Sequence, residues 1–251
     1  MSYYKYRITG GNGNRNFTQE ITPYLGITYD IGENHTLYAS YTSIFKPQTV
    51  KDIEGKYLDP IQGKDYELGI KGDYFDGALS ASFGVFKVVQ DKLGAKTGQK
   101  IPGTTTDAYE AKKGVTSKGF EVDVNGEINQ NLSLGLGLTH FNAKDADGKK
   151  FDTESSRTTA NLFAKYSIAD FRAGAGVQYK SKIYVGSGAN EITQKAYTLA
   201  NLMFGYRISK NFDIQLNIDN VFNKKYFEGI GNNRMVYGDP RTFNLGFTYS
   251  F

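Results

Sequence analysis

The sequence predicts an all-β protein, a closed, antiparallel, up-and-down transmembrane β-barrel of about twelve strands built from residues 1–251 as a single domain. Three observations lead to this prediction. Apolar and polar residues alternate along most of the chain, which is typical of strands with two different faces. Short turns alternate with longer polar loops. The last alternating segment ends on the final residue, Phe251.

The composition excludes helical membrane proteins and favours strands. The chain has 251 residues with 19 Tyr, 17 Phe, 29 Gly and 5 Pro, and aromatic residues are enriched in strands. Its mean hydropathy is -0.48, and it has no apolar stretch long enough for a transmembrane helix. A barrel wall escapes that test because its lipid-facing and lumen-facing residues cancel in any average. The near-balanced charge, +4 in total, gives no reason to expect a nucleic-acid partner.

The predicted strands follow one another along the chain with little between them that resembles a helix. They lie near residues 3–9, 21–31, 36–45, 66–74, 79–89, 120–125, 132–139, 158–168, 172–180, 197–208, 213–219 and 243–251. An even number of strands is expected when both chain ends return to the same side of the membrane. We therefore expect the strand near Tyr3 to pair with the strand of Phe251, because an unpaired edge is costly in lipid.

The connections predict which rim of the barrel is which. Tight turns are expected at residues 32–34, 75–77, 129–131, 169–170 and 209–211, and longer loops near 10–16, 47–63, 94–106, 144–154, 186–193 and 228–236. Short turns on one rim and long loops on the other are typical of outer-membrane barrels, whose short turns face the periplasm. A soluble barrel also has alternating strands but turns its apolar face inward, and the pattern alone does not say which face is inside.

The C-terminal strand carries a further signal. Its apolar face contains Phe243, Leu245, Phe247, Tyr249 and Phe251. This run resembles the C-terminal signal that the outer-membrane assembly machinery recognises. We therefore expect that machinery and a lipid bilayer or detergent as partners, a bacterial outer-membrane location and a monomer. The N-terminus of this sequence does not resemble a signal peptide.

Several motifs together resemble one family. Residues 216–226 read Leu-Asn-Ile-Asp-Asn-Val-Phe-Asn-Lys-Lys-Tyr, residues 237–241 read Tyr-Gly-Asp-Pro-Arg, and two earlier runs lie at 37–47 and 58–71. They resemble, in order, motifs of the barrel of TonB-dependent outer-membrane receptors, in the ferric-siderophore branch. Val221 and Asn223 replace the family's usual Leu and Asp. The resemblance implies a 22-stranded barrel with a plug domain, for which this chain has no space. It therefore predicts the C-terminal barrel portion, truncated or engineered.

The polar face of the predicted wall carries the charges with potential functional content. They are Glu67, Lys71, Asp73, Glu121, Asp123, Glu127, Arg172, Lys180, Lys182, Arg207 and Asp213. In a water-filled lumen such charges set ion selectivity. The alternative is that they only hydrate the wall or pair across strands. The two histidines, His35 and His140, and the absence of cysteine leave no set of residues for a catalytic site, a metal or a cofactor.

Three functions remain open from the sequence. The first is a passive, porin-like pore, derived from a siderophore receptor, for ions and small solutes. The second is a fragment of the receptor itself, binding an iron chelate through the loop aromatics Tyr57, Tyr109, Tyr184 and Tyr237. The third is a soluble or scaffold barrel without transport. No enzyme activity is expected.

Overall fold

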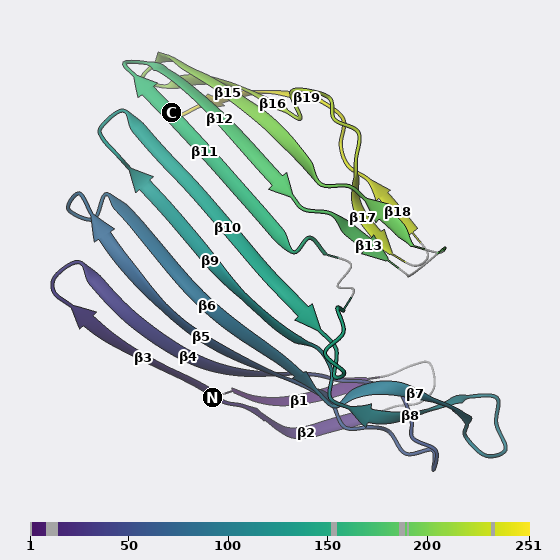
Figure 1. The fold of residues 1–251 in the computed structure, drawn as a ribbon. Helices are drawn as coiled ribbons and strands as arrows, with labels where there is room; N and C mark the ends of the chain where they lie inside the picture. Colours follow the sequence, from purple (N-terminus) through teal and green to yellow (C-terminus); the bar gives the residue numbers. More distant parts are fainter. Residues whose placement is uncertain (1, 9–14, 152–154, 186–188, 190, 232–233) are drawn as a thin grey trace.

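The computed structural model describes residues 2–8, 15–151, 155–185, 189, 191–231 and 234–251. Eleven of its strands form one antiparallel sheet (Figure 1). In chain order these are β3 (Tyr24–Ile31), β4 (His35–Lys46), β5 (Ile61–Tyr74), β6 (Leu79–Asp91), β9 (Thr116–Glu127), β10 (Leu132–Lys144), β11 (Thr158–Ile168), β12 (Phe171–Lys180), β15 (Tyr197–Ser209), β16 (Phe212–Asp219) and β19 (Thr242–Tyr249). Each strand pairs with the next of this series, so the predicted all-β, antiparallel, up-and-down architecture is confirmed.

Four two-stranded hairpins extend the sheet at one end, where Figure 1 shows β7, β8, β13, β17 and β18 beyond the main strands. The pairs are β1 (Ser2–Ile8) with β2 (Arg15–Thr22), β7 (Leu93–Lys100) with β8 (Asp107–Lys112), β13 (Ile183–Val185) with β14 (Ile192–Gln194), and β17 (Phe227–Gly231) with β18 (Arg234–Tyr237). Much of residues 94–106 and 228–236 was expected to be loop and is strand instead. Within these hairpins, Ile183 and Val185 of β13 and Ile230 of β17 form a small buried cluster against which Phe227 packs. The strands are too short to show the long apolar alternation that predicts the main strands.

Tight turns join the main strands at the opposite end, as predicted. Gly32 and Gly77 take the left-handed backbone conformation there, with φ of 68° and 82°, which glycine adopts without steric cost. At the β9–β10 turn, the side-chain Oδ1 of Asn129 accepts hydrogen bonds from the backbone N–H groups of Asn131 and Leu132. The long-loop rim holds the hairpins, although residues 10–14, 152–154, 186–188, 190 and 232–233 of the predicted loops lie outside the described residues.

The prediction of a closed, twelve-stranded barrel is not met by the described chain. The sheet has eleven strands, and β3 and β19 form its two outer edges. The strand near Tyr3 was expected to close the barrel against the C-terminal strand, but β1 pairs with β2. Pro23 separates β2 from β3, and its carbonyl accepts from the N–H of Ser43 on β4. The break between β2 and β3 therefore lies alongside β4, and β1 is paired with β2 and not with β19. Both edges therefore keep backbone groups that need partners in lipid.

The two faces of the sheet differ in the way the alternation predicts. On the apolar face, Leu25 and Ile27 are 70% and 69% exposed, and Phe243 and Phe247 are 64% and 61% exposed. No side chain of the described residues is both large and fully buried. A single sheet with an exposed apolar face has no core of its own, so this surface needs an apolar medium. The described residues include no helix long and apolar enough to cross a membrane.

Candidate functional site

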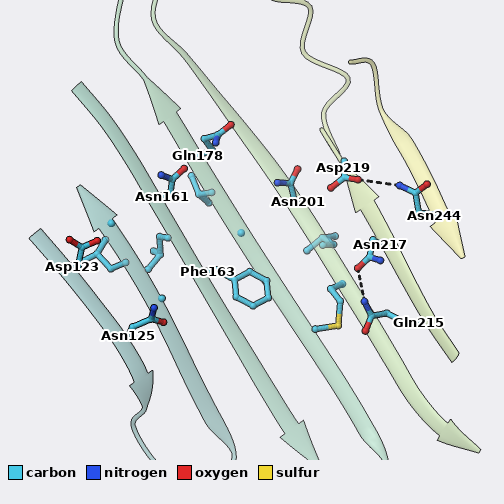
Figure 2. Close-up of a pocket in the computed structure, with 18 residues that line it drawn as sticks. Asp123, Asn125, Asn161, Phe163, Gln178, Asn201, Gln215, Asn217, Asp219 and Asn244 are labelled. Atoms are coloured by element: carbon cyan, nitrogen blue, oxygen red, sulfur yellow. Dashed lines mark hydrogen bonds between the residues drawn. The ribbon is translucent and has the colours of Figure 1, made fainter. Parts of the chain in front are cut away.

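A hollow of about 680 Å³ lies on the polar face of the sheet. Seven side-chain amides from β9 to β19 line it and form what we call the amide strip: Asn125, Asn161, Gln178, Asn201, Gln215, Asn217 and Asn244. Figure 2 shows these side chains with Asp123 beside Asn125 at one end of the group and Asp219 next to Asn244 at the other. The polar face is therefore concave across these strands, while the apolar face is turned outward.

The amide strip is a surface of neutral hydrogen-bond donors and acceptors. Gln215 donates to Oδ1 of Asn217 at 3.1 Å, and Asn244 donates to Oδ2 of Asp219 at 3.3 Å (Figure 2). Gly135 and Gly137 lie between the amides and keep the floor of the hollow low. Each amide has both donor and acceptor atoms, so the strip suits polar surfaces of either sign. The sequence interpretation concentrated on charges and missed this strip, although the amides alternate with apolar residues as plainly as the charges do.

Ten of the eleven charges singled out from the sequence lie on strands of the sheet, on the same face as the amide strip. The register shows this directly, since cross-strand partners share a face: Lys71 opposes Ser82, which opposes Asp123, and Arg207 opposes Asp213. Lys182 instead lies beyond the end of β12, with its Nζ 3.0 Å from Glu191. The selectivity role of these charges stays a prediction.

Two local networks hold charges flat against this face. The hydroxyl of Tyr38 donates to Oε1 of Glu67 at 2.5 Å, and Nζ of Lys71 lies 4.9 Å from the centre of the Tyr38 ring. The ring covers Gly69, where an added Cβ would be 2.5 Å from it. Farther round the sheet, Nη2 of Arg172 donates to both carboxylate oxygens of Asp213 at 2.6 and 2.8 Å. These charges are therefore paired or stacked and are not simply directed at solvent.

The four loop aromatics fall into two groups. Lys51 pairs with Tyr57 in an isolated β-bridge, and the Nζ of Lys51 lies 4.7 Å from the centre of the Tyr57 ring. The carbonyl of Lys51 also accepts a hydrogen bond from the N–H of Tyr109. Tyr184 lies on β13, where Nζ of Lys182 is 5.3 Å from its ring. Tyr237, on β18, packs against Phe227 with ring centres 4.6 Å apart and is 75% exposed. The structure thus brings together Tyr57 with Tyr109, and it places Tyr184 and Tyr237 on the other hairpin group.

Ion pairs stiffen the first of these groups. Asp107 on β8 accepts from Lys96, at 2.7 Å, and from Lys100 on β7. These two hydrogen bonds lower the pKa of the Asp107 carboxyl to about 2. The hairpin therefore carries a charge network at the rim of the sheet.

Two sequence motifs meet at a buried asparagine. Asn220, 4% exposed, donates from Nδ2 to the carbonyls of Lys224 and Asp239 at 2.9 and 3.0 Å and accepts from the N–H of Lys224 at 2.8 Å. Its own N–H donates to Oδ1 of Asn201 at 2.9 Å. The run at 216–226 and the run at 237–241 are therefore parts of one junction, and we infer a structural role for them.

The histidines and carboxylates of the described residues do not assemble into a metal site. Among the described residues, no group of three or more His, Asp or Glu side chains could hold a metal ion. His35 begins β4, with its Nε2 3.3 Å from the hydroxyl of Tyr74. His140 lies 5.7 Å from the Phe120 ring, and its Nδ1 is 2.8 Å from Oγ1 of Thr158. Each histidine therefore sits beside an aromatic ring on the outward face.

Comparison with known proteins gives consistent matches. The family model described as TonB dependent receptor-like, beta-barrel, matches residues 1–221. The ferric-pyoverdine 358 receptor of Pseudomonas putida is 35% identical, with 92% of this chain and 29% of that protein covered. The ferric-pyoverdine BN7/BN8 receptor of the same species is 36% identical, with 95% and 29% covered. The chain therefore spans less than a third of the length of these curated relatives.

Solved structures agree with these matches. The crystal structure of the ferripyoverdine receptor of the outer membrane of Pseudomonas aeruginosa bound to ferripyoverdine aligns with a TM-score of 0.88 at 31% identity. It covers 98% of this chain, which corresponds to 35% of that one. The structure of the alcaligin outer-membrane receptor of Bordetella pertussis aligns with a TM-score of 0.74 at 32% identity, over 86% of this chain and 38% of that one.

Proposed function

Because this chain belongs to the TonB-dependent receptor-like β-barrel family, we propose that it forms part of the barrel wall of a ferric-siderophore receptor in the bacterial outer membrane. The observation that carries this proposal is the agreement over 98% of the chain with a ferripyoverdine receptor in complex with its ligand. The exposed apolar face and the concave polar face are what a lipid-facing and a lumen-facing surface require. The predicted resemblance to this family is thus confirmed.

A receptor wall is better supported than a passive pore. A pore needs a closed wall, and the described sheet has free edges at β3 and β19. A wall segment needs no closure of its own, because strands supplied elsewhere in a receptor would pair with both edges. The soluble-barrel alternative is also disfavoured, since the apolar face of this sheet is exposed and not enclosed.

The ligand that we propose is a ferric chelate of the pyoverdine type. The two matched Pseudomonas putida relatives are both named for that ligand class. On this chain, the two groups of loop aromatics stand at the rim above the concave face. Tyr237 is the most accessible of the four, so it offers the largest aromatic surface to an incoming chelate.

The experiment measures the binding of ferric chelates to outer membranes from cells that produce the protein. Ferric pyoverdine and ferrioxamine B, each carrying radioactive iron, are compared at equal concentration, and the retained radioactivity is tested for saturation. We expect saturable binding of ferric pyoverdine and at least about fivefold weaker binding for the Tyr237→Ala variant, since losing an aromatic hot-spot contact costs more than about 1 kcal/mol. Tyr29→Ala is the control, because Tyr29 is 70% exposed on the outward face. Absence of saturable binding, together with stepwise ion conductance, would replace this proposal with the passive pore.

A further inference from the structure

The outward face of the sheet carries charge in one region only. Within the eleven strands of the main sheet, the register places five charged side chains on that face: Lys64, Lys87, Asp91, Lys118 and Lys144. They lie on β5, β6, β9 and β10, which are consecutive in the sheet, and all are near the hairpin end of their strands. The remaining outward positions of these eleven strands are uncharged. We call the four lysines the lysine quartet.

The lysines of the quartet are brought together by the pairing of the strands. Lys87 on β6 directly opposes Lys118 on β9. The next outward row toward the hairpins runs across β5, β6, β9 and β10 and holds, in that order, Lys64, Val89, Thr116 and Lys144. Like charges directly opposite on neighbouring strands are destabilising. Asp91 offsets this repulsion only weakly, because its carboxylate is 3.7 Å from the Nζ of Lys64. The cluster therefore keeps an uncompensated positive charge.

The quartet marks the edge of the apolar band. The next outward row toward the tight turns holds Leu68, Val85, Phe120 and His140. On β10, outward leucines continue from Leu138 to Leu132. From His140 to Leu132 the strand runs for roughly 26 Å. For a strand tilted by about 40° this length corresponds to a height of roughly 20 Å, which is most of the height of about 25 Å expected for the lipid-facing band. The lysines thus stand where lipid headgroups begin.

We propose that the lysine quartet is a binding site for the phosphate of an anionic lipid in the leaflet at the hairpin end. The ammonium groups supply point charges on flexible stems that extend along the apolar surface toward the headgroups. Phe120 and Val85 lie directly below and suit the acyl chain of the same lipid. One phosphate between Lys87 and Lys118 would turn a repulsive pair into two attractive contacts. Clusters of basic residues at a membrane surface attract anionic lipids in this way.

The test compares the protein in neutral detergent micelles that contain either phosphatidylglycerol or phosphatidylcholine, with the retained lipid counted by native mass spectrometry. We expect the protein to prefer phosphatidylglycerol, and Lys87→Gln with Lys118→Gln to reduce that preference by roughly 25-fold, or about fivefold per lysine. Lys87→Arg with Lys118→Arg keeps the charge and should keep most of the preference. The matched control is Lys46→Gln with Lys165→Gln, which removes the same charge from the concave face.

Thermal stability supplies a second readout that separates lipid binding from a merely structural role. In neutral micelles the double Gln variant should melt at a higher temperature than the unmodified protein, because repulsion is removed. Added phosphatidylglycerol should raise the melting temperature of the unmodified protein and leave that of the variant unchanged. Equal stabilisation by inorganic phosphate, or a phosphatidylglycerol preference that survives in the Gln variant, would overturn the proposal.

Discussion

Asn220 and Asp239 are joined by a hydrogen bond of 3.0 Å from the side-chain amide of the first to the backbone carbonyl of the second. This contact ties the chain that leaves β16 to the chain that enters β19, 19 residues later. Asn220 also has a positive φ, 47°, which asparagine tolerates better than most residues. Asn220 therefore both adopts the backbone conformation of this turn and makes the side-chain hydrogen bond that connects it to the chain before β19.

Asn220→Ala should lower the free energy of unfolding by about 3 kcal/mol, since it removes the side-chain hydrogen bonds of Asn220 to the carbonyls of Lys224 and Asp239 and places alanine in a left-handed conformation. Urea titration in lipid vesicles, followed by circular dichroism, measures the change. Asn161→Ala, an exposed position of the amide strip, is the control and should change stability by less than about 0.5 kcal/mol. Equal effects of the two substitutions would contradict the role given to Asn220.

The strands and their two faces could be predicted from the sequence, whereas the long-range contacts could not. Alternation was enough for the strands, because a two-residue period leaves a direct trace in the sequence. Closure was predicted wrongly, because strand pairing at the ends depends on partners that the local pattern does not contain. The role of Asn220 was also beyond the sequence, since its partners, Asn201 and Asp239, are brought to it only by the pairing of β15, β16 and β19. The motif was visible, but its structural reason was not.

Gly69→Ala should displace the Tyr38 ring and break its hydrogen bond to Glu67. An added Cβ would lie 2.5 Å from the ring, closer than real Cβ atoms approach. We expect a loss of about 1–3 kcal/mol, the usual cost of overpacking. Gly229→Ala is the control, because a Cβ added there would have nothing within 4 Å of it. The free energies of unfolding of both variants provide the measurement, and a harmless Gly69→Ala would show that the ring moves at no cost.

Arg172 and Asp213 should be energetically coupled across the intervening strand β15. Gly205 lies beneath the pair, and a Cβ there would be 2.6 Å from Nη2 of Arg172. A double-mutant cycle with Arg172→Gln and Asp213→Asn should give a favourable coupling that decreases with added salt, because both side chains remain partly exposed. A coupling that is zero at low salt would mean that the ion pair does not hold the strands in register.

The β7–β8 hairpin should loosen in strong acid. The pKa of Asp107 is lowered to about 2 by Lys96 and Lys100, so the carboxylate stabilises the hairpin above its unfolded pKa of about 3.9. That stabilisation should be lost as the pH falls toward 2. Hydrogen exchange of the hairpin amides between pH 5 and pH 2 measures it, with Asp107→Asn as the reference that lacks this pH dependence. Identical profiles for the two proteins would show that the ion pairs contribute nothing.

Val177 and Gln178, neighbours on β12, should respond differently to substitution by arginine. Val177 is on the outward face, 45% exposed, and Gln178 lines the concave hollow. Arginine on the lipid side of a barrel costs about 2–4 kcal/mol near the bilayer midplane, whereas lumen positions tolerate it. Val177→Arg should therefore reduce the fraction of protein that inserts into vesicles, measured by heat-modifiable migration in gels, and Gln178→Arg should not. The reverse order would mean that the assignment of the two faces is wrong, and with it the membrane orientation on which the proposed function rests.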